Sequence, residues 1–216
     1  MTTPQIHIQT AVRVTNKQVI VDVKPEKIAA YDDTSWLTSI YKHLGIQYPK
    51  FFKMDNLCKA GFLASEFVMR KAQASPSTEK KDWSVIVFNH YGSLDNDRTY
   101  QTTIQDPTNY YPSPAIFVYT LSNIVTGEIA IRHKIMGESC SYIQEQFDAE
   151  AIFDIGILAF QNNADIKNLL IGWIEYMEGS CDVLLFHLSS EKPIGVQHEW
   201  DIQTIEKFFH TFRSEE

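Results

Sequence analysis

The sequence predicts an α/β protein with a mixed central sheet flanked by helices. Segments typical of buried strands alternate with segments of helical periodicity along the chain, which is the pattern of this fold class. Hydrophobic residues make up 44% of the 216 residues, enough to form a sizeable core. Because no internal repeat or low-complexity tract interrupts the pattern, residues 1–216 are expected to form a single domain.

The first half of the chain begins with two short β-rich segments, Ile6 to Val14 and Gln18 to Val23. A turn signal, Thr15-Asn16-Lys17, separates them, so they are predicted to form a hairpin or two successive strands at one edge of the sheet. Trp36 to Leu44 has amphipathic character, and Asn56 to Ala74 places its apolar residues on one helical stripe. Both segments are predicted to be helices.

The middle of the chain is more polar. Ser75 to Asp82 has the composition of an exposed loop, and Trp83 to Asn89 after it is predicted to be a buried strand. His90 to Pro114 is rich in Asp, Asn, Thr and Tyr and is predicted to be a long functional loop or a cover for a partner surface. A helix capped by Ser122 or Asn123 is expected to run to about Lys134.

The last third again alternates strands and helices. Cys140 to Gln144 is predicted to be a strand and Asp148 to Asn162 an apolar helix. Lys167 to Met177 and Cys181 to Leu188 are predicted to be strands joined by a turn, and Ile202 to Phe212 a terminal helix.

Composition excludes several classes of function. The formal net charge of -8, from 27 acidic and 19 basic residues, argues against nucleic acid as a partner. No apolar run approaches the roughly 20 residues of a membrane span, and the first residues lack the basic start and apolar core of a signal peptide, so a cytoplasmic location is expected. No cofactor and no metal site are expected, because the three cysteines lie far apart and no phosphate loop or ligand cluster is present.

One junction points to a functional site. The segment SYIQEQFDAEAIFDIGILAF, from Ser141 to Phe160, passes from strand to helix with almost no loop. In open α/β sheets such a turn is a favoured place for a catalytic nucleophile. Its tip here is Gln144-Glu145-Gln146, and a neutral amide can donate and accept hydrogen bonds but cannot form a thioester.

Three blocks of sequence together resemble the amino-terminal half of the β-ketoacyl-ACP synthases, in the thiolase superfamily. They are KMDNLCKAGFLASEFVMRKA (53–72), SPAIFVYTLSNIVTGEIAIRHKIMGES (113–139) and the strand–helix junction. The most specific matches are Ser113-Pro114, the spacing from Asn123 to Gly127, and the turn at Gly137. The resemblance covers roughly Lys53 to Asp182 and implies a thiolase-like half-ketosynthase fold.

The resemblance also implies a role for the junction. Active members carry a cysteine there, and counting without a gap from Asn123 and Gly127 places Gln146 at that position. Chain-length factors, the inactive partners of type II polyketide condensing enzymes, look similar: they carry glutamine for cysteine, often preceded by glutamate, as Glu145 is here. Cys140 lies six residues earlier, at the start of the strand, and is expected to be an ordinary buried small residue.

By the same resemblance, the chain is expected to form a heterodimer with a full-length β-ketoacyl-ACP synthase and to meet the acyl carrier protein only indirectly. Ala115, Ile116, Phe117 and Tyr119 would then reach the partner's acyl tunnel and limit chain length sterically. Alternatively, Phe117 and Tyr119 are core aromatics of this chain. Short subunits of this kind look similar to those of aryl polyene and flexirubin-type systems. A half-length fold is further expected to expose a helix or sheet face for its partner.

Two other functions remain open. One is a stand-alone malonyl-ACP decarboxylase or acyl hydrolase that uses Gln146, Glu145 and a histidine, although His187, His198 and His210 lie outside the family's histidine motifs. The other is a purely structural scaffold subunit.

Overall fold

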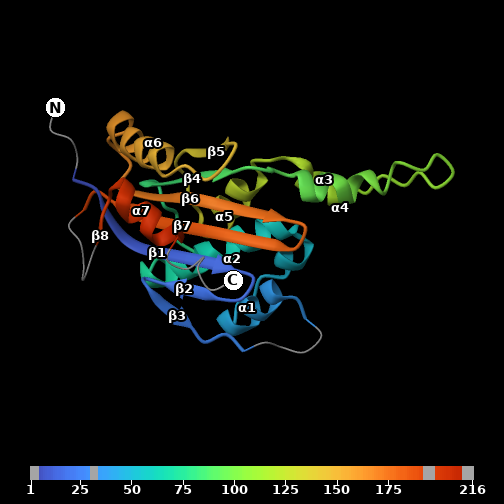
Figure 1. Cartoon of the computed structure of the whole chain (residues 1–216), viewed down its shortest axis with the longest axis horizontal. Helices are drawn as coiled ribbons and strands as arrows, with labels where there is room; N and C mark the ends of the chain where they lie inside the picture. The colour runs from blue at the N-terminus through green and yellow to red at the C-terminus, as the bar shows by residue number, and fades with distance from the viewer. Residues whose placement is uncertain (1–4, 30–33, 192–197, 211–216) are drawn as a thin grey trace.

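The computed structural model of the chain describes residues 5–29, 34–191 and 198–210. Its strands form one sheet with helices on both faces (Figure 1). The elements, in chain order, are β1 (His7–Thr15), β2 (Val19–Val21), β3 (Lys24–Glu26), α1 (Trp36–Leu44), η1 (Pro49–Lys53), α2 (Asn56–Lys71), β4 (Trp83–Asn89), α3 (Leu94–Gln101), α4 (Pro114–Phe117), η2 (Val118–Thr120), α5 (Ile124–His133), β5 (Ser139–Ile143), α6 (Ala149–Asn162), β6 (Asn168–Met177), β7 (Ser180–Ser189), β8 (His198–Glu199) and α7 (Ile202–His210).

The sheet is mixed, as the sequence predicts. Its strand order is β3-β2-β1-β7-β6-β4-β5, with β8 paired to β1. β4 runs parallel to both β5 and β6, whereas β7 runs antiparallel to β6 and β1. β5 therefore forms one edge of the sheet, and its carboxyl end lies beside the carboxyl end of β4.

Both faces of the sheet are covered. One core joins α1, α2 and α5 to side chains such as Val85, Val87 and Ile174, and the other joins α6 and α7 to side chains such as Phe88 and Phe186 (Figure 1). Buried on both faces, β4 and β7 consist of nearly continuous apolar runs.

In the described part of the chain, the sheet face on the side of α6 is covered by the last elements of the chain. Trp200 and the α7 residues Ile205 and Phe208 pack into the core between α6 and the sheet. On α6 itself, Leu158 keeps 44% of its surface exposed. Of the two possibilities expected from the sequence, a helix face or a sheet face, the described part of the chain leaves the outer side of helix α6 exposed.

The polar stretch from His90 to Pro114 is the main departure from the predicted elements. It contains helix α3, and with α4 and η2 it forms a projection, residues 90–123, which we call the arm (Figure 1). The α3 sequence LDNDRTYQ has no apolar stripe. The helix packs on α4 and η2 in the other limb of the arm more than on the core. Asp95 and Asp97 in its first turn favour the helix through its dipole.

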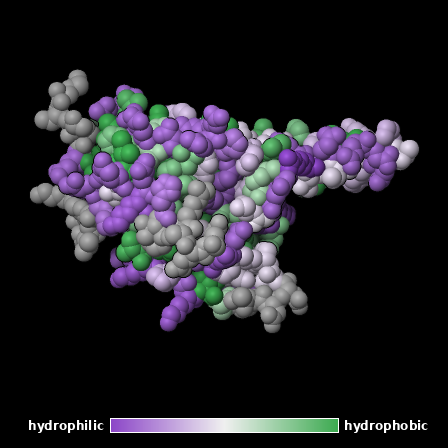
Figure 2. Space-filling view, viewed as in Figure 1, coloured by the Kyte–Doolittle hydropathy of each residue, from purple (hydrophilic) through white to green (hydrophobic). Residues whose placement is uncertain are grey.

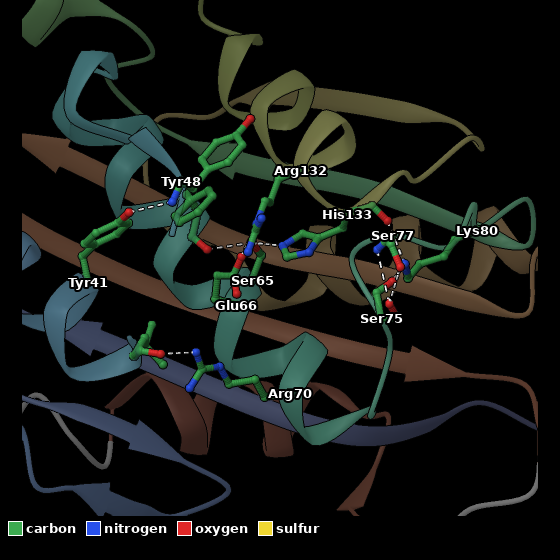
Figure 3. Close-up of polar contacts among 12 residues, drawn as sticks. Tyr41, Tyr48, Ser65, Glu66, Arg70, Ser75, Ser77, Lys80, Arg132 and His133 are labelled. Carbon is green, nitrogen blue, oxygen red and sulfur yellow. Dashed lines mark hydrogen bonds and ion pairs between the residues drawn. The ribbon is translucent and has the colours of Figure 1, made fainter. Parts of the chain in front are cut away.

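A buried polar cluster joins α2, α5 and the loop before β4 (Figure 3). Ser65 Oγ donates to the carbonyl of Phe62 over 2.8 Å, so at 2.8 Å it accepts from His133 Nε2. Arg132 pairs with Glu66. Lys80 Nζ donates to the carbonyls of Ser75, Thr78 and His133 at 2.6 to 2.9 Å. Lys80 lies in the segment predicted to be an exposed loop, but it is only 6% exposed.

Within the described ranges, none of the helices has both the length and the apolar composition for a membrane span, although Pro114–Thr120 and Ile124–His133, bent by 101°, together meet those two criteria.

Candidate functional site at the strand–helix elbow

The junction after β5 is an elbow held from both sides. The N–H of Gln144 donates to the carbonyl of Asn89 over 2.8 Å, which extends the pairing of β4 and β5 to the turn. Asp148 caps the following helix, because its Oδ1 accepts from the N–H of Ala151 over 3.0 Å. Between these two fixed points Glu145 and Gln146 form a bend, and both are exposed.

The elbow opens into a cleft of about 970 Å³. Phe147 and Trp173 line it together with seven acidic side chains: Glu145, Asp148, Glu150, Glu175, Glu178, Asp182 and Glu206. Glu145 and Gln146, which the sequence analysis places together, both line this cleft. The sequence does not indicate how many carboxylates from β6, β7 and α7 join them, because those strands and that helix come together only in the folded chain.

His90 also lines this cleft, and sequence reasoning missed it. Its Nδ1 lies 2.9 Å from the carbonyl of Gln144, so Nδ1 is the donor and Nε2 is left as the acceptor. Glu175 fixes the backbone there, since its Oε2 accepts from the N–H groups of His90 and Tyr91 at 2.6 and 3.1 Å. The order of the strands could have indicated this position, because His90 directly follows β4 and the carboxyl ends of parallel neighbouring strands lie at the same edge of the sheet.

The four residues expected at a partner's tunnel lie on the arm but in two environments. Ala115, Ile116 and Phe117 belong to α4, and Phe117 is 56% exposed with its ring 5.4 Å from that of Tyr100. Tyr119, in η2, is 5% exposed, and its hydroxyl donates to Glu128 Oε1 over 3.1 Å. Tyr119 thus packs as a core aromatic of this chain, whereas Phe117 does not.

Cys140 lies away from the turn. It pairs in register with Ile86 in the middle of β4, and its Sγ lies 3.9 Å from Glu138 Oε1. It does not line the cleft. The elbow therefore presents an amide and carboxylates, but no thiol.

Comparison with known proteins points to one fold. No protein-family profile and no curated protein matches the sequence. Among solved structures, the chain resembles the ishigamide ketosynthase/chain length factor with a TM-score of 0.64 and 15% identity, over 86% of this chain and 62% of that one. The fold is that of the ketosynthases.

Two further structures agree. A chain of the ketosynthase ApeO in complex with its chain length factor ApeC, from Xenorhabdus doucetiae, matches with a TM-score of 0.53 and 9% identity over 88% of this chain and 92% of that one. A β-ketoacyl synthase from Burkholderia phymatum matches with a TM-score of 0.58 and 9% identity over 86% and 59%. The ketosynthase-like resemblance is thereby confirmed as a fold, and the chain spans less than two thirds of the ishigamide and Burkholderia chains.

Proposed function

We propose that this chain is a non-catalytic ketosynthase-like subunit, a chain-length factor, that pairs with a full-length β-ketoacyl-ACP synthase. Residues 1–216 act as one domain in this complex, in the cytoplasm. The partner performs the condensation, and the acyl carrier protein is met through the partner. By its sequence resemblance we assign the pair to bacterial type II fatty acid or polyketide biosynthesis, of the aryl polyene or flexirubin type.

The chemistry of the elbow carries this proposal. Condensation needs a thiolate to hold the acyl chain, and the elbow offers the amide of Gln146 instead. The seven carboxylates around the cleft also disfavour a malonyl group or a phosphopantetheine arm, because both are anionic. Because the site repels the substrates of condensation, it supports the proposal that the partner subunit performs this chemistry.

The free edge of the sheet supports pairing. Within the described chain β5 is hydrogen-bonded on one side only, to β4, and its residues Tyr142 and Ile143 are 37% and 54% exposed. An edge strand with unpaired backbone groups and exposed apolar side chains is a template for a strand of another chain. We assign this edge to the synthase.

The arm supplies the steric part of the proposal. In the complex, Ala115, Ile116 and Phe117 border the partner's acyl tunnel, and the Phe117 ring blocks a further two-carbon unit. Elbow residues Glu145 and Gln146 lie at the interface and do no chemistry.

Replacing Phe117 by alanine tests the tunnel role. The Phe117→Ala variant, co-expressed with the synthase, is expected to yield products at least one two-carbon unit longer, because the blocking ring is gone. The measurement is product mass by mass spectrometry. Tyr110→Ala is the matched control: Tyr110 is also an exposed aromatic of the arm, outside α4, and its loss is expected to leave product length unchanged. Unchanged length in Phe117→Ala with an intact complex would favour a purely structural scaffold.

One observation favours a second candidate, a stand-alone malonyl-ACP decarboxylase or acyl hydrolase. His90 offers an acceptor nitrogen in the same cleft as Gln146. The chain purified alone would then release carbon dioxide from malonyl-ACP or hydrolyse an acyl-ACP, and His90→Gln and Gln146→Ala would each abolish this activity. Our proposal predicts no turnover by the chain alone.

A further inference from the structure

The two limbs of the arm are joined to each other along their length. Ser93 Oγ donates to the carbonyl of Thr120 over 2.9 Å, and Asn96 Nδ2 donates to the carbonyl of Ile116 over 2.9 Å. Towards the tip, the N–H of Tyr111 donates to the carbonyl of Thr103 over 2.9 Å. The arm therefore moves as a unit, and its direction depends on how its base is attached.

The outgoing limb is attached to the body at the surface. Asp95 Oδ1 accepts from the N–H of Glu178 in the β6–β7 turn over 2.9 Å, and Arg98 pairs with the Glu178 side chain. Arg98 and Glu178 are 54% and 70% exposed in this pair. Exposed ion pairs of this kind contribute little free energy, so this contact fixes the arm only weakly.

The returning limb is attached inside the body. The Tyr119 hydroxyl donates to Glu128 Oε1 on α5, and Glu128 Oε2 pairs with Lys50 Nζ from η1 over 2.8 Å. The Glu128 side chain is 2% exposed. Burial, and then the Glu128 carboxylate, raise the pKa of Tyr119, so the hydroxyl keeps its proton and remains a donor.

We propose that the buried contact between Tyr119 and Glu128 is a mount that sets where α4 carries the Phe117 side chain, which makes Tyr119 and Glu128 positioning residues for chain-length control. The inference rests on the proposed function. η2 follows α4 without a break, so Tyr119 lies two residues after Phe117. Any shift of the Tyr119 ring relative to α5 is transmitted through this short rigid segment to Phe117.

The geometry explains why an acidic residue is buried at this point of α5. A buried carboxylate is costly unless it is paired and hydrogen-bonded, and Glu128 has both partners. Each oxygen is directed to a different element, so η1, α5 and η2 are fixed relative to one another. A tyrosine used only for packing would not need its hydroxyl here.

The test is a double-mutant cycle on the complex with the synthase. Tyr119→Phe removes only the hydroxyl, and losing this hydrogen bond is expected to raise the share of products longer by two carbons about fivefold. Tyr111→Phe, at the exposed tip of the arm, is the matched control and is expected to change nothing. In the Phe117→Ala background, Tyr119→Phe is expected to add no further lengthening, because the ring that the mount positions is already absent.

The outcomes separate the mount from the function on which it rests. If Phe117→Ala leaves product length unchanged, the tunnel proposal itself fails. If Phe117→Ala lengthens products and Tyr119→Phe does not, the mount is overturned while the tunnel role stands. Equal lengthening by Tyr119→Phe with and without Phe117 also contradicts the mount. Glu128→Gln, which keeps an acceptor for Tyr119 but loses the charge that pairs with Lys50, is a second variant and is expected to lengthen products less than Tyr119→Phe does.

A measurement on the chain alone distinguishes a local effect of Tyr119→Phe from a general loss of stability. In Tyr119→Phe, amide hydrogen exchange is expected to quicken about fivefold in residues 113–121 and to stay unchanged in α2. Faster exchange throughout the chain would show a global loss of stability and would contradict a local mount.

Discussion

Gln146 lies in the bend between β5 and α6, at the position that the sequence resemblance assigns to the nucleophile of an active synthase. A helix N-terminus lowers the pKa of a nearby thiol, but surrounding carboxylates raise it. Here Glu145, Asp148 and Glu150 lie within four residues of Gln146, and Asp148 is already the cap of α6. The surroundings of residue 146 are therefore unsuited to a thiolate, whichever side chain occupies it.

Restoring a cysteine should consequently not restore an active synthase. We expect Gln146→Cys to form no acyl-enzyme with an acyl-ACP donor, and to react with iodoacetamide at pH 7 no faster than free cysteine. Intact-protein mass spectrometry measures both. The parent chain is the control: Cys58 and Cys181 are buried and burial raises the pKa of both thiols, while the partly buried Cys140 sets the background reactivity that is subtracted. A stoichiometric acyl-enzyme in Gln146→Cys would show that the elbow still activates a nucleophile.

The sequence alone could not show which of Phe117 and Tyr119 is buried in the core. Both are aromatic residues two positions apart, and periodicity assigns neither to the core. Tyr119 is buried because Glu128 offers its hydroxyl an acceptor, and Glu128 lies on another helix. His90 was missed for the same reason, since about fifty residues separate it from the elbow that it borders.

Among the elements, those buried on both faces were predicted best. β4, β6 and β7 are apolar runs flanked by turn residues, and burial leaves them little choice of side chain. The helix predicted from Asp148 to Asn162 is likewise confirmed as α6, which begins at Ala149 with Asp148 as its cap. α3 was missed because it lacks an apolar stripe, and β3 and β8 are too short to carry a pattern.

Packing between elements also buries two histidines, which makes the stability of the fold sensitive to acid. His133 ends α5 and is 1% exposed, and His187 on β7 stacks on Trp83 with 4.6 Å between the ring centroids. Burial lowers the pKa of His133 to about 3, helped by Arg132, and lowers the pKa of His187 to about 4. Both rings are therefore neutral in the folded chain near pH 6, while in the unfolded chain they begin to bind protons.

These lowered pKa values make the folded chain less stable as the pH falls. Each histidine has a lower pKa in the folded chain than the value of 6.5 that it has in the unfolded chain. Its neutral ring therefore stabilises the fold fully above pH 6.5, and this stabilisation is lost as the pH falls towards 4 for His187 and towards 3 for His133. Between pH 6 and pH 5 we expect the free energy of unfolding to fall by about 2 kcal/mol for the two histidines together. His133→Gln should roughly halve that loss. Urea unfolding at the two pH values measures it, and an equal loss in parent and variant would contradict the assignment to His133.

The surfaces that we assign to the partner, namely the edge of β5, the base of the arm and the elbow, lie next to one another. Gly92 at the start of the arm lies against Ile143 at the end of β5, where an added Cβ would come within 3.3 Å of the Ile143 side chain. Hydrophilic residues cover much of the visible body and of the outer arm, and hydrophobic residues show where the arm leaves the body as well as at the opposite end of the body (Figure 2). The free strand edge, the base of the arm and the elbow thus form one continuous surface.

The central claim is that this chain works in a pair with a complete synthase. The most direct test is to co-express it with each condensing enzyme encoded beside it, purify through a tag on this chain, and measure the mass of the product by light scattering. We predict a stable complex of one copy of each chain with one such enzyme. A chain that purifies as a monomer or homodimer and binds none of these enzymes would contradict the account.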